Sequence, residues 1–487
     1  MNEDTIMHNA LFTDFYELTM AQGFWKRGYV GRRVVFDYFF RRHPFAGGYS
    51  VFAGLDSLLD ALENFRFGQD DLAYLESLGS FDKGFLDFLA GFKFTGTLYA
   101  AKEGEIIFPQ EPLVRIEADL LQAQIIEGVI LNTINFQNLI ATKSARVWLA
   151  SGKGHIMEFG LRRAQGADGA LSATRAAFIG GAFGTSNTIA GKRFGIPVLG
   201  TMAHSWVMSY PTELEAFRAY ASTYPDGTVF LIDTYNTLES GTANAIIAGK
   251  ELQAQGHNFG VRLDSGDIDY LTREVRRKLD EAGCPKATIT VSNDLDESII
   301  EHLVATKAPI DTWGVGTNLV TGGNDAAFTG VYKLAAIQDG DGFRPVMKIS
   351  DNPEKTTNPG IKGLYRIYNG DNIPRLDLIT VNDEIPEEGK PLTAYHPSGD
   401  YRQLQIVPTK VEPLLSKVFE GGVRVGERPS LKESQAYFMK RIQLFDSTYL
   451  RQLNPHVYKV SISGRLKQTK LGIIAQNQAT RYANLTK

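Results

Sequence analysis

The 487-residue chain contains one cysteine, Cys284, which lies between Gly283 and Pro285. A single thiol excludes an intramolecular disulfide framework and is typical of a reducing compartment, so we expect a cytoplasmic protein. The sequence also lacks any run of about eighteen apolar residues, and we therefore expect no membrane-spanning helix. Its first residues are acidic and precede no long apolar core, so no signal peptide is expected.

A strong excess of charge of either sign is absent as well. The chain has 51 Lys and Arg against 55 Asp and Glu, a formal net charge of −4. This balance argues against a general binder of nucleic acid or acidic membranes. The net charge does not exclude small anionic substrates, because local clusters of Arg and Lys determine whether they bind.

The usual nucleotide and metal motifs are missing too. Gly249-Lys250 lacks the upstream glycine of a Walker sequence, and the glycines of 180–184 have the wrong spacing for a dinucleotide fingerprint. The histidines have no ligand spacing, so a structural zinc site is not expected.

What the sequence does contain is a recurring pattern between residues 155 and 317. Short apolar runs each end on a polar cluster and are followed by a helical pattern; the runs are 155–160, 197–201, 229–232, 259–263, 287–291 and 311–315. Such alternation is typical of parallel βα units. We expect an irregular α/β barrel, similar to a TIM barrel, with its active site where the strands end.

Three segments are expected from this pattern. Residues 1–137 would form a mixed α/β domain and residues 138–375 the catalytic barrel. Residues 376–487 would pack back on the N-terminal domain, because neither flank has a complete core of its own.

Arg262-Leu-Asp-Ser-Gly-Asp267 follows one of the apolar runs. Arg262 and Asp264 are two residues apart in a predicted strand and therefore point to one face. The arginine could bind a phosphate or carboxylate through two hydrogen bonds, and the aspartate could hold a ribose diol or hydrated magnesium. The simpler alternative is that Asp264 or Asp267 caps the next helix.

Three further candidates have weaker signals. His204 lies at a run end, and Asp233 at the next could orient it, which suits proton transfer or attack on phosphate; a structural histidine is the alternative. Gly316 and Thr317 could cradle a phosphate, although glycines also end strands for steric reasons. Tyr16 belongs to an aromatic helix face that is either core or a platform for a planar ring.

Taken together, these residues resemble the nicotinate phosphoribosyltransferase family. The matching blocks follow the family's order from residue 11 past residue 360. They include Thr13-Asp-Phe-Tyr-Glu-Leu-Thr-Met20, Glu158-Phe-Gly-Leu-Arg-Arg-Ala-Gln-Gly166, Gly200-Thr-Met-Ala-His-Ser205, Arg262-Leu-Asp-Ser-Gly-Asp267 and Val331-Tyr-Lys-Leu334. So many ordered blocks are more specific than a likeness of fold.

The resemblance implies an enzyme that joins nicotinate to 5-phosphoribosyl 1-pyrophosphate, with Mg²⁺ present and ATP hydrolysis coupled. It implies that His204 is phosphorylated by ATP, and that Asp233 and Asp264 hold the ribose, the metal or His204. The positions implied to bind nicotinate or phosphoribosyl groups are Tyr16, Phe159, Arg162, Thr201, Arg262, Gly316 and Thr317.

The family also implies a homodimer whose N-terminal block, with Tyr16, completes the partner's site. We expect Asn187 to favour the acid over the amide, because nicotinamide-using relatives have an aspartate at the position that best matches it; helix capping is the alternative.

Other functions are a nicotinamide- or quinolinate-using phosphoribosyltransferase and an inactive ligand sensor of the same fold. Quinolinate needs a more basic pocket and no phosphorylatable histidine. A sensor would be expected to have lost Arg262, Asp264 or His204, and all three are present.

Overall fold

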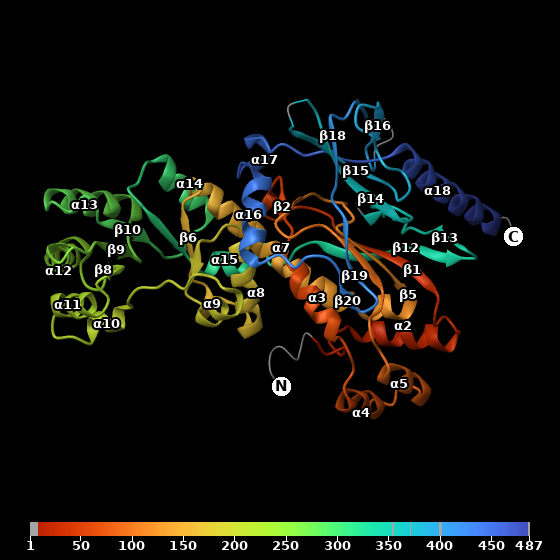
Figure 1. Ribbon diagram of the computed structural model, residues 1–487, viewed down its shortest axis with the longest axis horizontal. Coiled ribbons are helices and arrows are strands. Elements are labelled where there is room, and N and C mark those ends of the chain that lie inside the picture. The colour runs from red at the N-terminus through yellow and green to blue at the C-terminus, as the bar shows by residue number, and fades with distance from the viewer. Residues whose placement is uncertain (1–7, 353–354, 371, 399–401, 486–487) are drawn as a thin grey trace. The chain divides into compact units, whose positions relative to one another are not determined.

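The structure of the protein is a computed structural model that describes residues 8–352, 355–370, 372–398 and 402–485. The chain forms two compact units (Figure 1). The first contains residues 1–139 and 327–487, and the second residues 140–326. The second unit begins close to the expected boundary but ends at 326 instead of 375, and the C-terminal segment belongs to the first unit.

Residues 327–375 differ from the expectation because β12 (Gly330–Asp339) is an antiparallel neighbour of β1 (Arg33–Phe40), with Phe39 opposite Val331. These strands belong to a seven-stranded sheet of order β13-β12-β1-β5-β3-β19-β20. Its other members are β3 (Thr97–Ala100), β5 (Val114–Asp119), β13 (Gly342–Pro345), β19 (Ser416–Glu420) and β20 (Val423–Arg424).

The first unit has a second large sheet, of order β17-β16-β21-β15-β14-β18. Its strands are β14 (Lys362–Tyr368), β15 (Pro374–Val381), β16 (Leu392–Tyr395), β17 (Gln403–Ile406), β18 (Lys410–Pro413) and β21 (Val460–Ile462). Two short strands, β2 (Ser50–Val51) and β4 (Ile106–Ile107), pair with each other in a separate sheet.

The α-helices of this unit are α2 (Phe15–Lys26), α3 (Leu55–Asn64), α4 (Gln69–Ser77), α5 (Lys83–Ala90), α6 (Leu120–Ile125), α16 (Leu431–Ile442), α17 (Ser447–Leu450) and α18 (Gly464–Leu485). Helix α7 (Glu127–Ala150) begins in the first unit and ends in the second.

The second unit is built on a six-stranded sheet of order β7-β6-β11-β10-β9-β8, in which all recorded pairs are parallel. Its strands are β6 (His155–Glu158), β7 (Gly184–Thr185), β8 (Thr228–Leu231), β9 (Phe259–Leu263), β10 (Thr288–Val291) and β11 (Thr312–Val315). The inner strands are almost continuously buried, as expected for parallel strands covered on both faces.

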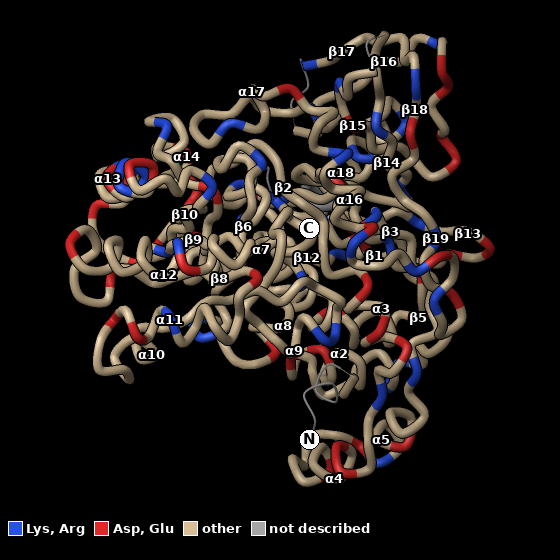
Figure 2. The backbone as a smooth tube through the Cα atoms, turned by 60° about the vertical axis from the view of Figure 1, so that its left-hand side comes forward, with Lys and Arg blue, Asp and Glu red and all other residues tan. Residues whose placement is uncertain are grey.

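Helices connect these strands and cover the sheet. They are α8 (Gly166–Ile179), α9 (Thr188–Phe194), α10 (His204–Met208), α11 (Glu213–Thr223), α12 (Thr242–Ala254), α13 (Ile268–Glu281), α14 (Glu297–Ala305) and α15 (Thr317–Thr321). The exposed face of α13 carries arginines paired with acids three or four residues away, and Figure 2 shows both signs interspersed along it. A continuous basic stripe for nucleic acid is therefore not found on this helix.

The α/β class is confirmed, but the recorded pairing leaves the sheet of the second unit open, with β7 and β8 at its edges. The run 197–201 was expected to be a strand and contributes one parallel bridge, between Val198 and Thr185. Closure into a barrel stays a prediction. Within the described residues, no helix combines the length and apolarity needed to cross a membrane.

Two buried carboxylates lie together in the first unit, Glu17 of α2 and Glu127 of α7. The Gln124 side chain donates to both of them, and Lys333 Nζ lies 3.7 Å from Glu127 Oε1. Burial raises the pKa of Glu127 to about 7; the positive charge of Lys333 opposes this rise, and the nearby Glu17 carboxylate adds to it.

This pKa shift predicts a loss of stability as the pH rises. The folded state favours protonated Glu127, whereas the unfolded chain ionises it near 4.5, so up to about 3 kcal/mol is lost between pH 4.5 and pH 7. We expect Glu127→Gln to unfold at a higher temperature than the unmodified protein at pH 8, and at a similar temperature at pH 4.5. Thermal unfolding at both pH values tests this, and equal differences at the two would contradict it.

Candidate active site

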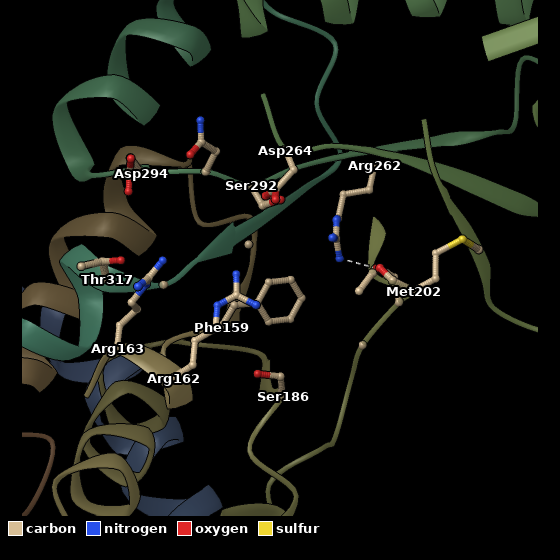
Figure 3. Close-up of a pocket in the computed structure, with 16 residues that line it drawn as sticks. Phe159, Arg162, Arg163, Ser186, Met202, Arg262, Asp264, Ser292, Asp294 and Thr317 are labelled. Atoms are coloured by element: carbon tan, nitrogen blue, oxygen red, sulfur yellow. Dashed lines mark hydrogen bonds between the residues drawn. The ribbon is translucent and has the colours of Figure 1, made fainter. Parts of the chain in front are cut away.

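The carboxyl ends of the parallel strands in the second unit surround a cavity of about 390 Å³ (Figure 3). Because the strands are parallel, their ends meet at one edge of the sheet and the loops that follow share that edge. The cavity is lined by Phe159, Arg162, Arg163, Ser186, Gly200, Thr201, Met202, Ala203, Arg262, Asp264, Ser292, Asn293, Asp294, Gly314, Gly316 and Thr317.

One wall of the cavity is the turn that follows β6. Phe159 comes directly after the strand, and Arg162 and Arg163 lie in the short helical turn Leu161–Arg163. The ring of Phe159 rests against Gly314 of β11, where an added Cβ would lie 2.7 Å from the ring carbon Cδ2. A glycine is therefore needed at position 314 to keep this aromatic ring at the cavity.

Arg262 enters the cavity from β9 and donates a hydrogen bond to the hydroxyl of Thr201, shown as a dashed line in Figure 3. Its Nε is buried without a hydrogen-bond partner. Burial lowers the pKa of the guanidinium from its ordinary value, and the carboxylates of Asp264 and Asp233 oppose that change. An arginine stays protonated under such conditions, so a partly buried positive charge lines the cavity.

Asp233 and Asp264 follow neighbouring strands and are linked through the backbone. Asp233 Oδ2 accepts from the Asp264 amide at 3.0 Å and from the Ser265 hydroxyl at 2.6 Å, while its Oδ1 is buried without a partner. Asp264 Oδ1 accepts from Ser292 Oγ at 2.5 Å. Capping of α13 falls to Asp267, whose side chain accepts from Tyr270 N, so Asp264 is left to face the cavity.

Magnesium is commonly held in proteins by one or two carboxylates together with substrate phosphates. Asp264 at the cavity and Asp233 with its unused oxygen fit that role. No cluster of three or more Asp, Glu, His or Cys side chains suited to a metal occurs in the described part of the chain.

His204 begins α10, one residue after the cavity-lining Ala203. Its Nδ1 lies 3.1 Å from Thr234 Oγ1, so the recorded partner of the ring is Thr234 and not the expected Asp233. A hydrogen bond at Nδ1 directs the other ring nitrogen, Nε2, away from this contact.

Asn187 was expected to contact the substrate, but its side chain does not line the cavity. The residue is fully buried, its Oδ1 accepts from Ala190 N at 3.2 Å, and its Nδ2 donates to Thr174 Oγ1 at 3.2 Å. Its amide therefore caps α9 and bonds to α8, and the neighbouring Ser186 lines the cavity in its place. Tyr16 belongs to the other unit, where its side chain is half exposed.

No individual role was predicted for Arg163, Ser186, Met202 or the turn Ser292-Asn293-Asp294, and all of them line the cavity. The turn follows the apolar run 287–291, so its place at a strand end agrees with the predicted position of the active site. Asn293 and Asp294 have φ of 89° and 39°, in the left-handed region that residues other than glycine seldom adopt. Such conformations gather at ligand sites, where the surrounding structure holds them.

The sequence matches three family models along most of its length. They describe the nicotinate phosphoribosyltransferase N-terminal domain at residues 11–135, the family at 154–385 and the C-terminal domain at 361–470. The nicotinate phosphoribosyltransferase of Bacillus subtilis is 44% identical over 455 residues, 93% of each chain.

The chain belongs to the nicotinate phosphoribosyltransferase family.

This confirms the resemblance of the sequence blocks. The human nicotinate phosphoribosyltransferase is 32% identical over 516 residues, which cover 94% of this chain and 95% of the human one. A crystal structure of human nicotinic acid phosphoribosyltransferase superposes with a TM-score of 0.84 at 29% identity, over 94% of this chain and 99% of the other. The likeness to the family thus extends over nearly the whole fold.

The partly buried charge of Arg262 leads to a prediction about anion binding. Arg262→Met should weaken the binding of inorganic pyrophosphate about tenfold or more, because a hydrogen bond to a charged group contributes roughly 1.5–3 kcal/mol. Calorimetric titration measures it. Arg218→Met is the matched control, since Arg218 lies on α11 in an exposed ion pair with Glu251. Equal affinities in the two variants would contradict a role for Arg262 in anion binding.

Proposed function

We propose that this protein transfers the phosphoribosyl group of 5-phosphoribosyl 1-pyrophosphate to the ring nitrogen of nicotinate. The products are nicotinate mononucleotide and pyrophosphate, and the reaction would begin NAD synthesis from nicotinate. The observation that carries the proposal is the cavity at the carboxyl edge of the second unit's sheet, which combines three arginines with carboxylates in a member of this family.

Both substrates and both products are anions, and the cavity offers matching charge. Arg162, Arg163 and Arg262 supply positive charge for carboxylate, phosphate and pyrophosphate. Phe159 provides an aromatic surface for a planar pyridine ring. Thr201, Gly316 and Thr317 line the same cavity and offer hydroxyl or backbone donors.

The chemistry separates charge at the ribose. The bond between C1 and the pyrophosphate oxygen breaks as the pyridine nitrogen bonds to C1, and positive charge gathers on the ribose while negative charge gathers on the leaving group. Asp264 would face the ribose and the arginines the pyrophosphate, which are preorganised charges of the required sign. Magnesium, held by Asp264 and Asp233, would supply further positive charge at the leaving group.

ATP hydrolysis would be coupled to the transfer through His204. The γ-phosphoryl group of ATP would pass to Nε2 of His204, with ADP leaving, and water would later release it as phosphate. The support is the Thr234 contact at Nδ1, which directs Nε2 away from it. A phosphate at this position shifts the equilibrium only if it changes the affinities for substrates and products to different extents.

We also infer a homodimer, in which Tyr16 of a second copy stacks on the pyridine ring. The support is the half-exposed side chain of Tyr16 on α2. A family resemblance over the N-terminal block agrees with this. A half-exposed aromatic ring is well suited to a contact with a ligand or another chain.

An assay of the purified protein tests the function. With 5-phosphoribosyl 1-pyrophosphate and Mg²⁺, nicotinate should yield nicotinate mononucleotide, ATP should stimulate the yield, and nicotinamide should react far less. His204→Ala should lose the stimulation and the acid-labile phosphate label that ATP introduces. No turnover of nicotinate would refute the function, and a label that persists in His204→Ala would refute the histidine's role alone.

Preference for the acid gives a separate prediction at Ser186, which lines the cavity without charge. Ser186→Asp should raise the KM for nicotinate by at least about tenfold, because two anions a few ångströms apart repel by a few kcal/mol at an effective dielectric near 20. The KM for 5-phosphoribosyl 1-pyrophosphate should change less. Ser186→Asn is the uncharged control of similar size, and an equal rise in both variants would assign the effect to size instead of charge.

A further inference from the structure

A buried carboxylate lies directly behind the cavity wall. Glu158, the last residue of β6, is 1% exposed. Its Oε1 accepts from the backbone amide of Gly160, and its Oε2 accepts from Thr185 Oγ1 at 2.5 Å. Thr174 Oγ1 lies 2.9 Å from Glu158 Oε2 and also 2.9 Å from the Ala170 carbonyl, and its one hydrogen is shared between these acceptors. These contacts place N–H and O–H donors around both oxygens, as buried polar atoms require.

The hydrogen bonds continue beyond the carboxylate. Thr185 Oγ1 accepts from the backbone amide of Asn187 at 2.9 Å, and Asn187 Nδ2 donates to Thr174 Oγ1 at 3.2 Å. We call Glu158, Thr174, Thr185 and Asn187 the Glu158 network. It joins β6, α8, β7 and the start of α9, and its four members are all buried outside the cavity lining.

Two members of the network lie next to residues of the cavity. Glu158 precedes Phe159, and Thr185 precedes Ser186, whose backbone amide also donates to the Glu158 carbonyl at 3.0 Å. In Figure 3 the side chains of Phe159 and Arg162 lie on the turn after β6, and Ser186 lies below them on the segment that follows β7. The network therefore connects the two segments that would contact the pyridine ring.

The turn after β6 is closely fitted around this carboxylate. A Cβ added at Gly160 would lie 2.9 Å from Glu158 Oε1 and 2.2 Å from Val320 Cγ1. The backbone of the turn can therefore approach the carboxylate only because residue 160 is a glycine. A buried carboxyl oxygen that loses its hydrogen-bond partner carries the full desolvation penalty, so these hydrogen bonds hold the turn in place.

We propose that Glu158 is a positioning residue, which acts with Thr185 to hold the Phe159–Arg163 turn at a fixed distance from Ser186. This inference rests on the proposed function, because it assigns the two segments to the nicotinate subsite. Substrate-binding side chains need such support, since a displacement of about 1 Å is enough to lower activity on the order of a hundredfold.

Two substitutions at Thr185 test the inference. Thr185→Val removes the hydroxyl and keeps the shape, and should raise the KM for nicotinate about tenfold with a smaller change in kcat. Thr185→Ser keeps the hydroxyl and loses a methyl group, and should keep the KM within about twofold. A purely structural role predicts a loss of stability without a change in KM in either variant: Thr185→Ser leaves a small cavity, and Thr185→Val leaves Glu158 and the Asn187 amide without the hydroxyl that they bind.

Glu158→Gln provides a second variant in case Thr185→Val does not fold, and it should raise the KM in the same way. Glu213→Gln is its matched control, because Glu213 is buried in the same unit, binds Asn244 and does not line the cavity. An unchanged KM in both Thr185→Val and Glu158→Gln would overturn the inference, and so would an equal rise in Glu213→Gln.

Titration of the same variants with inorganic pyrophosphate separates this inference from the proposed function. Arg162 belongs to the supported turn, so Thr185→Val and Glu158→Gln should also bind pyrophosphate about tenfold more weakly, whether or not the protein uses nicotinate. Pyrophosphate affinity equal to that of the unmodified protein in both variants contradicts the positioning role. Failure of the unmodified protein to use nicotinate, with weakened pyrophosphate binding in the variants, refutes the function and supports the positioning role.

Discussion

The cavity of the second unit depends on the parallel direction of its strands. Because β6 to β11 are all parallel, each delivers the residues that follow it to the same edge of the sheet. Phe159, Ser186, Asp264 and Thr317 are distant in sequence and meet at one cavity for this reason. An antiparallel neighbour in this sheet would send its following loop to the opposite edge. The apolar runs that form the strands are thus also what assembles the site.

Much of this arrangement could be predicted from the sequence, since continuous apolar runs such as 259–263 form buried parallel strands. Which of Ser186 and Asn187 lines the cavity could not be predicted from the sequence. It depends on which of the two side chains faces the cavity after the two-residue strand β7. The end of the second unit at 326 was missed because β12 pairs with β1, almost three hundred residues earlier in the chain. Pro197 and its neighbours resembled a strand and form a single bridge.

Charge in the cavity is arranged in two layers. The side chains that line it include the exposed Arg162 and Arg163 and the partly buried Arg262. Behind them, carboxylates and hydroxyls hold the loops: Asp233 bonds to the amide of Asp264, and Glu158 bonds to that of Gly160. The cavity-lining loops are thereby held by carboxylates that accept hydrogen bonds from their backbone amides. Such support holds the loops in place although they bring several positively charged side chains together at the cavity.

The central claim is that one cavity at this sheet edge receives both the pyridine and the phosphoribosyl group. A crystal structure of the protein with nicotinate mononucleotide and pyrophosphate tests it most directly. The account predicts the pyridine ring against Phe159 and near Ser186, the ribose near Asp264, and anionic oxygens within hydrogen-bond distance of Arg162 or Arg262. Nucleotide bound in another part of the molecule, with these side chains free, would contradict the account.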